Sequence, residues 1–166
     1  MENPHSILKK VFGYDSFRPG QEEIVSRLLA GQDVLAVMPT GAGKSLCYQV
    51  PALLLPGLTL VISPLISLMK DQVMALRNAG IPAGCINSSM SLDELRETYR
   101  DARYGAYKLL YVAPERLLTA GFCSLAEERA DPRRSVCAWS GCGSRCWPST
   151  RRTASRSGGR ISGPAI

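Results

Sequence analysis

The sequence lacks several features that would each assign it to a particular class of protein. It has no run of about 18 apolar residues that could span a membrane, and its first residues lack the basic-then-apolar pattern of a secretory signal. It contains one histidine, and its six cysteines never occur in Cys-x-x-Cys spacing. We therefore expect no zinc site, and we expect a cytoplasmic protein whose thiols stay reduced.

Net charge is also absent from most of the chain, although the chain as a whole carries +6. Residues 1–129 carry 13 basic and 13 acidic residues, so the whole excess lies in residues 130–166, with seven Arg and one Asp. That tail has no apolar period of 2 or 3.6 and is rich in Arg, Ser, Gly and Pro. The sequence predicts one folded domain over 1–129 and a disordered tail over 130–166.

Apolar runs and helical patterns alternate along residues 1–129, which predicts an α/β fold with a parallel sheet and flanking helices. Strands are expected at Asp33–Met38, Leu58–Ile62, Pro82–Asn87 and Lys108–Val112. Helices are expected at 4–12, 19–30, from 45 to a kink or stop at Pro51, 65–79, 91–103 and 120–129.

One short stretch carries the clearest chemistry, because an apolar run, a small-residue loop, Lys-Ser and a helix follow in that order. The loop consists of Thr40, Gly41, Ala42, Gly43, Lys44 and Ser45. Its backbone N–H groups and the helix N-terminus suit a polyphosphate, with Lys44 reaching the β- and γ-phosphates and the Ser45 hydroxyl holding Mg²⁺. The alternative is an ordinary Gly-rich turn. The expected strand, the loop, Lys-Ser and the expected helix occur in the order that a phosphate loop requires, which favours that interpretation. Met38 replaces the first Gly of the full motif G-x-x-x-x-G-K-[ST].

Four segments together resemble the RecQ family of DNA helicases in order and spacing. They are Phe12-Gly-Tyr-Asp-Ser-Phe-Arg-Pro-Gly-Gln21 (motif 0), Met38-Pro-Thr-Gly-Ala-Gly-Lys-Ser-Leu-Cys-Tyr-Gln49 (motif I), Val61-Ile-Ser-Pro-Leu-Ile-Ser-Leu-Met-Lys-Asp-Gln72 (motif Ia) and Leu110-Tyr-Val-Ala-Pro-Glu-Arg116 (motif Ib). The resemblance runs from about residue 7 to about residue 129. It implies a partial N-terminal RecA-like P-loop motor lobe that uses ATP and Mg²⁺.

In motif 0, the resemblance implies that Tyr14, Arg18 and Gln21 hold the adenine. A planar ring can stack on the base, and an amide can meet both a donor and an acceptor on its edge. The residues alone favour another interpretation, in which Phe12, Tyr14 and Phe17 pin two helices together.

Motifs Ia and Ib follow strands, at the end where parallel sheets present ligand loops. The resemblance implies that they grip the backbone of single-stranded DNA, through Ser63, Pro64, Ser67, Lys70, Pro114, Glu115 and Arg116. Taken in isolation, Lys70 and Arg116 read as solvated surface charges, and Glu115 as a charge at a helix N-terminus.

Residues 117–166 contain no Asp-Glu-Ala-His string, which the family uses to hold Mg²⁺ and position water. The second motor lobe is absent too. The resemblance therefore implies an N-terminal fragment of a 3′→5′ ATP-dependent DNA helicase of recombination and repair, with Lys44 as its catalytic residue. We expect it to act on single-stranded or forked DNA in full-length form and to be inactive alone. Without the missing central strands, we expect an open sheet edge beside Val34–Val37 and poor solubility.

Two other classes of function fit the sequence less well. A small stand-alone nucleotide-binding module could use the Arg-rich tail on nucleic acid, but the tail lacks aromatic residues interleaved for stacking. A P-loop kinase would need a carboxylate base and acceptor-binding residues, and no motif for either follows the loop.

The tail also predicts a shifted reading frame. If each new codon takes the last base of one codon and the first two of the next, Trp147 to Pro164 can read AVDEAHCVSQWGQDFRP with permitted synonymous codons. This reading supplies the missing motif II and the aromatic-rich loop after it, and it makes the cysteines of the tail accidents of translation. Sequencing the gene is the test: an alternative frame without Asp-Glu-Ala-His would refute the frameshift.

Overall fold

The computed structural model describes residues 3–129 and 137–139, and from residue 44 onward its helices alternate with parallel strands. The α/β class is confirmed. In chain order the elements are α1 Pro4–Phe12, α2 Gln21–Leu29, α3 Lys44–Leu54, β1 Thr59–Ile62, α4 Ile66–Asn78, β2 Ala83–Ile86, α5 Leu92–Arg103, β3 Leu109–Val112, the 3₁₀ turn η1 Pro114–Arg116, α6 Ala120–Arg129 and β4 Cys137–Trp139.

Local capping signals fix the helix ends where the sequence predicts them. The Asn3 side chain accepts a hydrogen bond from the Ser6 backbone N–H at 2.8 Å, and Gly13 ends α1 in the left-handed conformation with φ 75°. Ser91 and Glu94 form a reciprocal capping box at the start of α5. Each device satisfies backbone groups that a helix end would otherwise leave unpaired.

The sheet has the order β2-β3-β1-β4, with every neighbouring pair parallel. Strand β3, which lies between β2 and β1, is buried along its whole length. Leu109 and Tyr111 join one apolar cluster, whereas Leu110 and Val112 join another. Because successive side chains of a strand face opposite sides, both faces of this sheet are covered.

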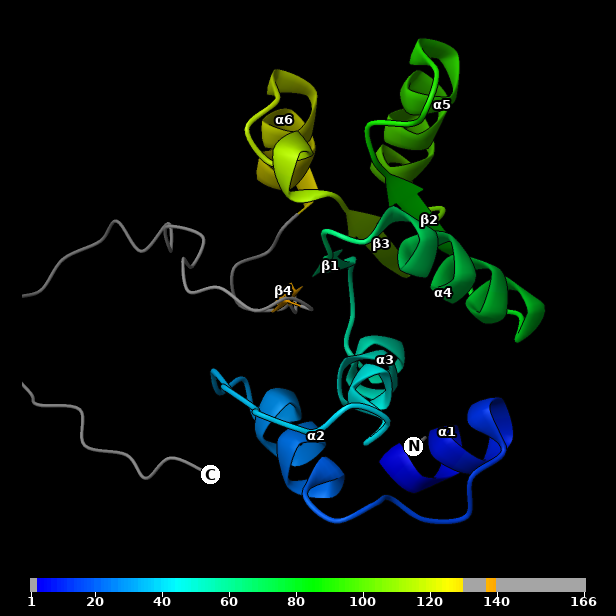
Figure 1. Ribbon diagram of the computed structural model, residues 1–166, viewed down its shortest axis with the longest axis vertical. Coiled ribbons are helices and arrows are strands. Elements are labelled where there is room, and N and C mark those ends of the chain that lie inside the picture. The colour runs from blue at the N-terminus through cyan, green and yellow to red at the C-terminus, as the bar shows by residue number, and fades with distance from the viewer. Residues whose placement is uncertain (1–2, 130–136, 140–166) are drawn as a thin grey trace, which may run out of the picture.

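Different helices cover the two faces. Met69, Val73 and Leu76 of α4 belong to the cluster on one face, with Ala52 of α3. Phe122 and Leu125 of α6 belong to the cluster on the other face, together with α5. Helices α1 and α2 pack on α3 through a third cluster, and Figure 1 shows these three helices grouped at one end, joined to the sheet by the link from α3 to β1. No helix among the described residues has the length and apolar character needed to cross a bilayer.

The strand predicted at Asp33–Met38 is wrong. These residues form no regular element, and the Leu35 and Val37 side chains are 90% and 83% exposed. A strand exists only with a partner for its backbone groups, and no described strand pairs with this segment. The apolar run that leads into the phosphate loop thus lies open to solvent.

Two further expectations need correction. Of the kink or stop expected at Pro51, the stop is wrong, because helix α3 continues to Leu54 and the Pro51 carbonyl accepts a hydrogen bond from Leu55 N at 2.9 Å. The kink stays a prediction. Most of the tail 130–166 lies outside the described residues, yet Cys137–Trp139 form strand β4 beside β1. The reason is that the backbone N–H and C=O groups of an edge strand can pair with another segment whether or not its side chains alternate between apolar and polar.

Replacing Leu35 with Lys should raise solubility without lowering the free energy of unfolding by more than about 0.5 kcal/mol, because the side chain makes few contacts. Light scattering against concentration and urea unfolding measure the two effects. Leu118→Lys is the matched control, since Leu118 is also 90% exposed but follows the η1 turn. An equal gain from both variants would show that charge alone, and not the unpaired segment, governs self-association.

Candidate functional site

The loop before α3 has the backbone shape that a phosphate cradle requires. Gly41 and Gly43 both lie in the left-handed region, with φ of 82° and 75°. Helix α3 starts at Lys44, directly after this loop, and no side chain caps its N-terminus. The first N–H groups of the helix and the positive end of its dipole are therefore directed at the loop, where they favour an anion.

Gln21 fastens this loop to the start of α2. Its side chain is 1% exposed, and its amide nitrogen donates to the carbonyl oxygens of Ala42 and Gly43 at 3.0 and 3.1 Å. Its amide oxygen accepts from the Arg18 backbone N–H at 2.9 Å. A Cβ atom on Gly43 would lie 2.5 Å from that amide nitrogen, so glycine is required there by space as well as by φ.

The other motif 0 residues reach the same place or remain open. The Arg18 guanidinium donates to the Gly41 carbonyl at 2.7 Å. Tyr14 is 51% exposed, whereas Phe12 and Phe17 pack into the cluster of α1, α2 and α3. The helix-pinning interpretation thus fits Phe12 and Phe17 but not the half-exposed Tyr14. Adenine binding by Tyr14, Arg18 and Gln21 stays a prediction.

Lys44 turns its ammonium group back over the loop. It donates to the Met38 carbonyl at 2.8 Å and approaches the Pro39 carbonyl at 3.4 Å, and the side chain is exposed. Ser45 follows at half-buried depth, and Thr40 is exposed. This donor set, with an uncapped helix end, one cation and one hydroxyl, fits a triphosphate. It fits Mg²⁺ through Ser45 and phosphate oxygens, since Mg²⁺ is commonly held by few protein groups and the substrate's phosphates.

Motifs Ia and Ib lie at one edge of the sheet, because β1 and β3 are adjacent and end in register at Ile62 and Val112. Pro64, Ser67 and Lys70 are exposed there. Ser63 is 1% exposed: its backbone N–H donates to the Val112 carbonyl at 3.1 Å, and its hydroxyl accepts from Leu65 N at 3.4 Å. Ser63 is therefore engaged in the turn after β1, although the sequence interpretation made it a surface donor.

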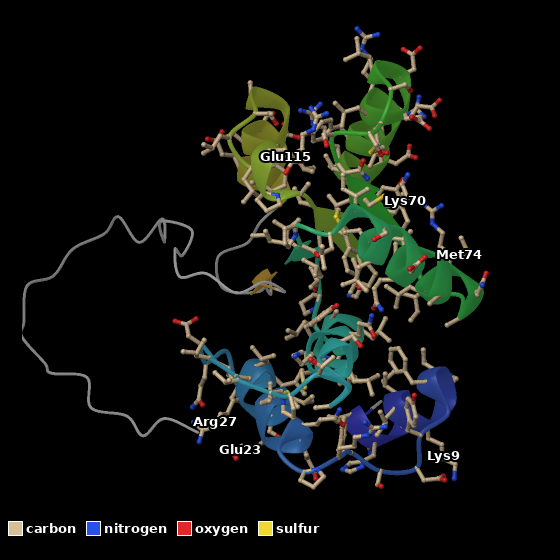
Figure 2. The ribbon with its side chains drawn as sticks, viewed as in Figure 1. Lys9, Glu23, Arg27, Lys70, Met74 and Glu115 are labelled. Carbon is tan, nitrogen blue, oxygen red and sulfur yellow. The ribbon has the colours of Figure 1, made fainter. Side chains whose placement is uncertain are left out.

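Arg116 has a donor without a partner. Its Nε atom is the single side-chain nitrogen or oxygen of the described residues that is buried and makes no hydrogen bond. Arg116 is the last residue of the η1 turn, which begins at Pro114, and the residue between these two, Glu115, is exposed. Figure 2 shows Glu115 after β3 and Lys70 on α4. An unsatisfied buried donor is costly, so an incoming acceptor at this turn would be stabilised.

Comparison with known proteins agrees with this geometry. The family model of DEAD/DEAH box helicases matches residues 18–136. This chain belongs to that family. It is 58% identical over 120 residues to the ATP-dependent DNA helicase RecQ of Haemophilus influenzae, and 49% identical over 128 residues to that of Bacillus subtilis. It is 44% identical over 131 residues to the ATP-dependent DNA helicase Q1 of Pongo abelii.

The matches cover most of this chain but only a small share of each relative. They cover 72%, 76% and 77% of the chain, but 19%, 22% and 20% of the three relatives. The chain thus spans about a fifth of the length of the curated relatives it matches. The predicted resemblance to the N-terminal part of a RecQ helicase is confirmed.

Sequence reasoning missed a group of polar side chains behind the loop of this RecQ-like chain. Gln49, Gln72 and Tyr111 join through hydrogen bonds inside the core. The available signal was position, because Gln49 stands four residues after Ser45 in an otherwise apolar stretch of helix, and residues four apart share a helix face.

Gly43→Ala should disrupt the loop more than its backbone conformation alone explains. The new methyl group would meet the Gln21 amide, so we expect nucleotide affinity to fall at least about tenfold in addition to lost stability. Gly57→Ala is the control: Gly57 also has a positive φ, of 90°, but its added Cβ meets nothing within 4 Å. We expect that variant to lose about 1–2 kcal/mol of stability. Equal stability and affinity losses in both variants would disprove the contact with Gln21.

Proposed function

We propose that this chain is the nucleotide-binding part of the first motor lobe of a RecQ-like, ATP-dependent 3′→5′ DNA helicase of recombination and repair, acting in the cytoplasm. The observation that carries the proposal is the loop at 40–45, which Gln21 and Arg18 hold open in front of an uncapped helix. No such clamp would be needed for an ordinary Gly-rich turn.

In this proposal ATP binds with its phosphates on the loop. Lys44 leaves the Met38 carbonyl for the β- and γ-phosphates, since an ionised acceptor forms the stronger hydrogen bond. Ser45 holds Mg²⁺, and Tyr14 stacks on the adenine. Bound Mg²⁺ supplies neutralisation of the charge that develops on the transferring phosphoryl group.

Single-stranded DNA, or the single-stranded arm of a fork, binds across the carboxyl ends of β1 and β3. Ser67 and Lys70 donate to phosphates from α4, and the Arg116 guanidinium donates from the η1 turn. Pro64 and Pro114 line the surface between them, while Glu115 sets the orientation of the turn. Such contacts hold the backbone without reading sequence.

The chain alone is proposed to bind these ligands but not to hydrolyse ATP. Positioning the attacking water requires a carboxylate in the nucleotide site. None of the loop residues 40–45 is acidic, and Asp15, the one acidic residue of motif 0, is exposed and paired with Lys9 at 3.0 Å. The catalytic role of Lys44 would be expressed only in a protein that also contains the second lobe.

A crossed binding experiment tests the proposal. Lys44→Ala should weaken binding of a fluorescent ATP analogue about tenfold or more and leave oligothymidine binding unchanged, because one charge-assisted bond is lost. Arg116→Ala should weaken oligothymidine binding and leave binding of the ATP analogue unchanged. It should also reduce the slope of log affinity against log salt concentration by about one, because one phosphate contact is lost.

Controls for this experiment come from charged residues with other partners. Lys9→Ala removes an exposed lysine paired with Asp15, and Arg96→Ala removes an arginine paired with Asp93. Both should behave as the unaltered chain. Wild-type affinity for both probes in Lys44→Ala and Arg116→Ala would contradict the proposed sites.

A further inference from the structure

Four polar side chains, two of them buried and two half-buried, form a hydrogen-bonded network between the helix that follows the phosphate loop and the elements that carry motifs Ia and Ib. The Gln49 amide nitrogen donates to Gln72 Oε1 at 2.9 Å and to the Tyr111 hydroxyl at 3.2 Å. The hydroxyls of Tyr48 and Tyr111 are 3.4 Å apart. Gln49 is 5% exposed and Tyr111 is 2% exposed.

Each residue of the network lies on an element that also carries residues of the phosphate loop, motif Ia or motif Ib. Tyr48 and Gln49 lie one helical turn after Lys44 and Ser45 on α3, on the faces those residues begin. Gln72 lies on α4, two residues after Lys70. Tyr111 is the penultimate residue of β3, three residues before the Pro114–Arg116 turn begins.

The chemistry of Gln49 makes this arrangement directional. An amide nitrogen carries two hydrogens, and Gln49 directs one to α4 and the other to β3, so its donor capacity is used completely. Apolar contacts with neighbours such as Ala52, Met69 and Val73 are non-directional. The hydrogen bonds of Gln49 are directional, because they weaken steeply when the donor–hydrogen–acceptor angle departs from its optimum.

The network also keeps its protonation across the physiological range. Burial raises the pKa of the Tyr48 phenol and that of the Tyr111 phenol, so both hydroxyls stay neutral. A neutral, satisfied network in a low dielectric is stronger than separate bonds in water, and an unmade bond within it is costly.

We propose that Gln49 and Tyr111 are positioning residues that transmit occupancy of the phosphate loop to the DNA-contacting segments after β1 and β3. The inference rests on the proposed function, since it assumes that both ligands bind. A phosphate that draws Lys44 and Ser45 toward itself shifts the first turn of α3. The shift reaches α4 and β3 together, because Gln49 holds both.

A purely structural role is the competing interpretation, and it makes a different prediction. A structural network would lower stability when cut and would leave the effect of one ligand on the other unchanged. A transmitting network would leave each separate affinity nearly unchanged and would remove the mutual effect.

The experiment measures the dissociation constant of fluorescein-labelled oligothymidine for the full chain, with and without saturating ATP and Mg²⁺. In the unaltered chain, ATP should change this constant by about fivefold or more. In Gln49→Leu the ratio should fall to one, with each separate affinity within about twofold. Gln32→Leu, the same change at an exposed glutamine, should keep the ratio of the unaltered chain.

Tyr111→Phe repeats the test without changing packing volume, since it removes only the hydroxyl that joins Gln49 and Tyr48. It carries the test if circular dichroism shows that Gln49→Leu is unfolded. A ratio of one in the unaltered chain, or an unchanged ratio in Tyr111→Phe, overturns the proposal while both probes still bind. Failure of the unaltered chain to bind either probe refutes the proposed function, and the inference falls with it.

Discussion

The parallel ladder between β1 and β3 is the interaction on which the rest of the structure depends. It aligns Thr59 with Leu109 and Ile62 with Val112, so that motifs Ia and Ib leave the sheet at one edge. The same pairing buries β3 between two apolar clusters, each closed by its own helices. Backbone groups inside a core must be paired, and only neighbouring strands can pair them here. Where no neighbouring strand occurs among the described residues, as at Asp33–Met38, apolar character alone makes no strand.

That contrast explains which parts of the fold could be predicted. The ends of α1 and α5 follow from Asn3, Gly13 and the Ser91–Glu94 box, because capping is local in sequence. Residues 33–38 look like a buried strand by composition, and their state depends on partners that composition does not reveal. The short pairing of Cys137–Trp139 with β1 was equally invisible, since it needs an open edge and no pattern.

The candidate site divides in the same way. The glycines, Lys44 and Ser45 were predicted because their spacing is itself the geometry of the loop. The interior contacts were not predicted: the Gln21 amide nitrogen donates to the loop carbonyls, and its expected contact with the base stays a prediction. Ser63 was expected at the surface and lies within a turn. Such partners are far apart in sequence, so only the folded chain brings them together.

Helix α3 is held at both of its ends, which gives it a mechanical role between the two halves of the molecule. At its start, Gln21 and Arg18 bind the loop that precedes Lys44. At its end, the Lys108 ammonium donates to the Leu55 carbonyl, where a cation also complements the helix dipole. Lys108 directly precedes β3, so the end of α3 is bonded to the residue before that strand. Gln49, in the middle of α3, is bonded to Tyr111 near the end of the same strand. These two contacts, at Lys108 and at Tyr111, are the ones through which β3 would share a displacement of the first turn of α3, as the proposed coupling requires.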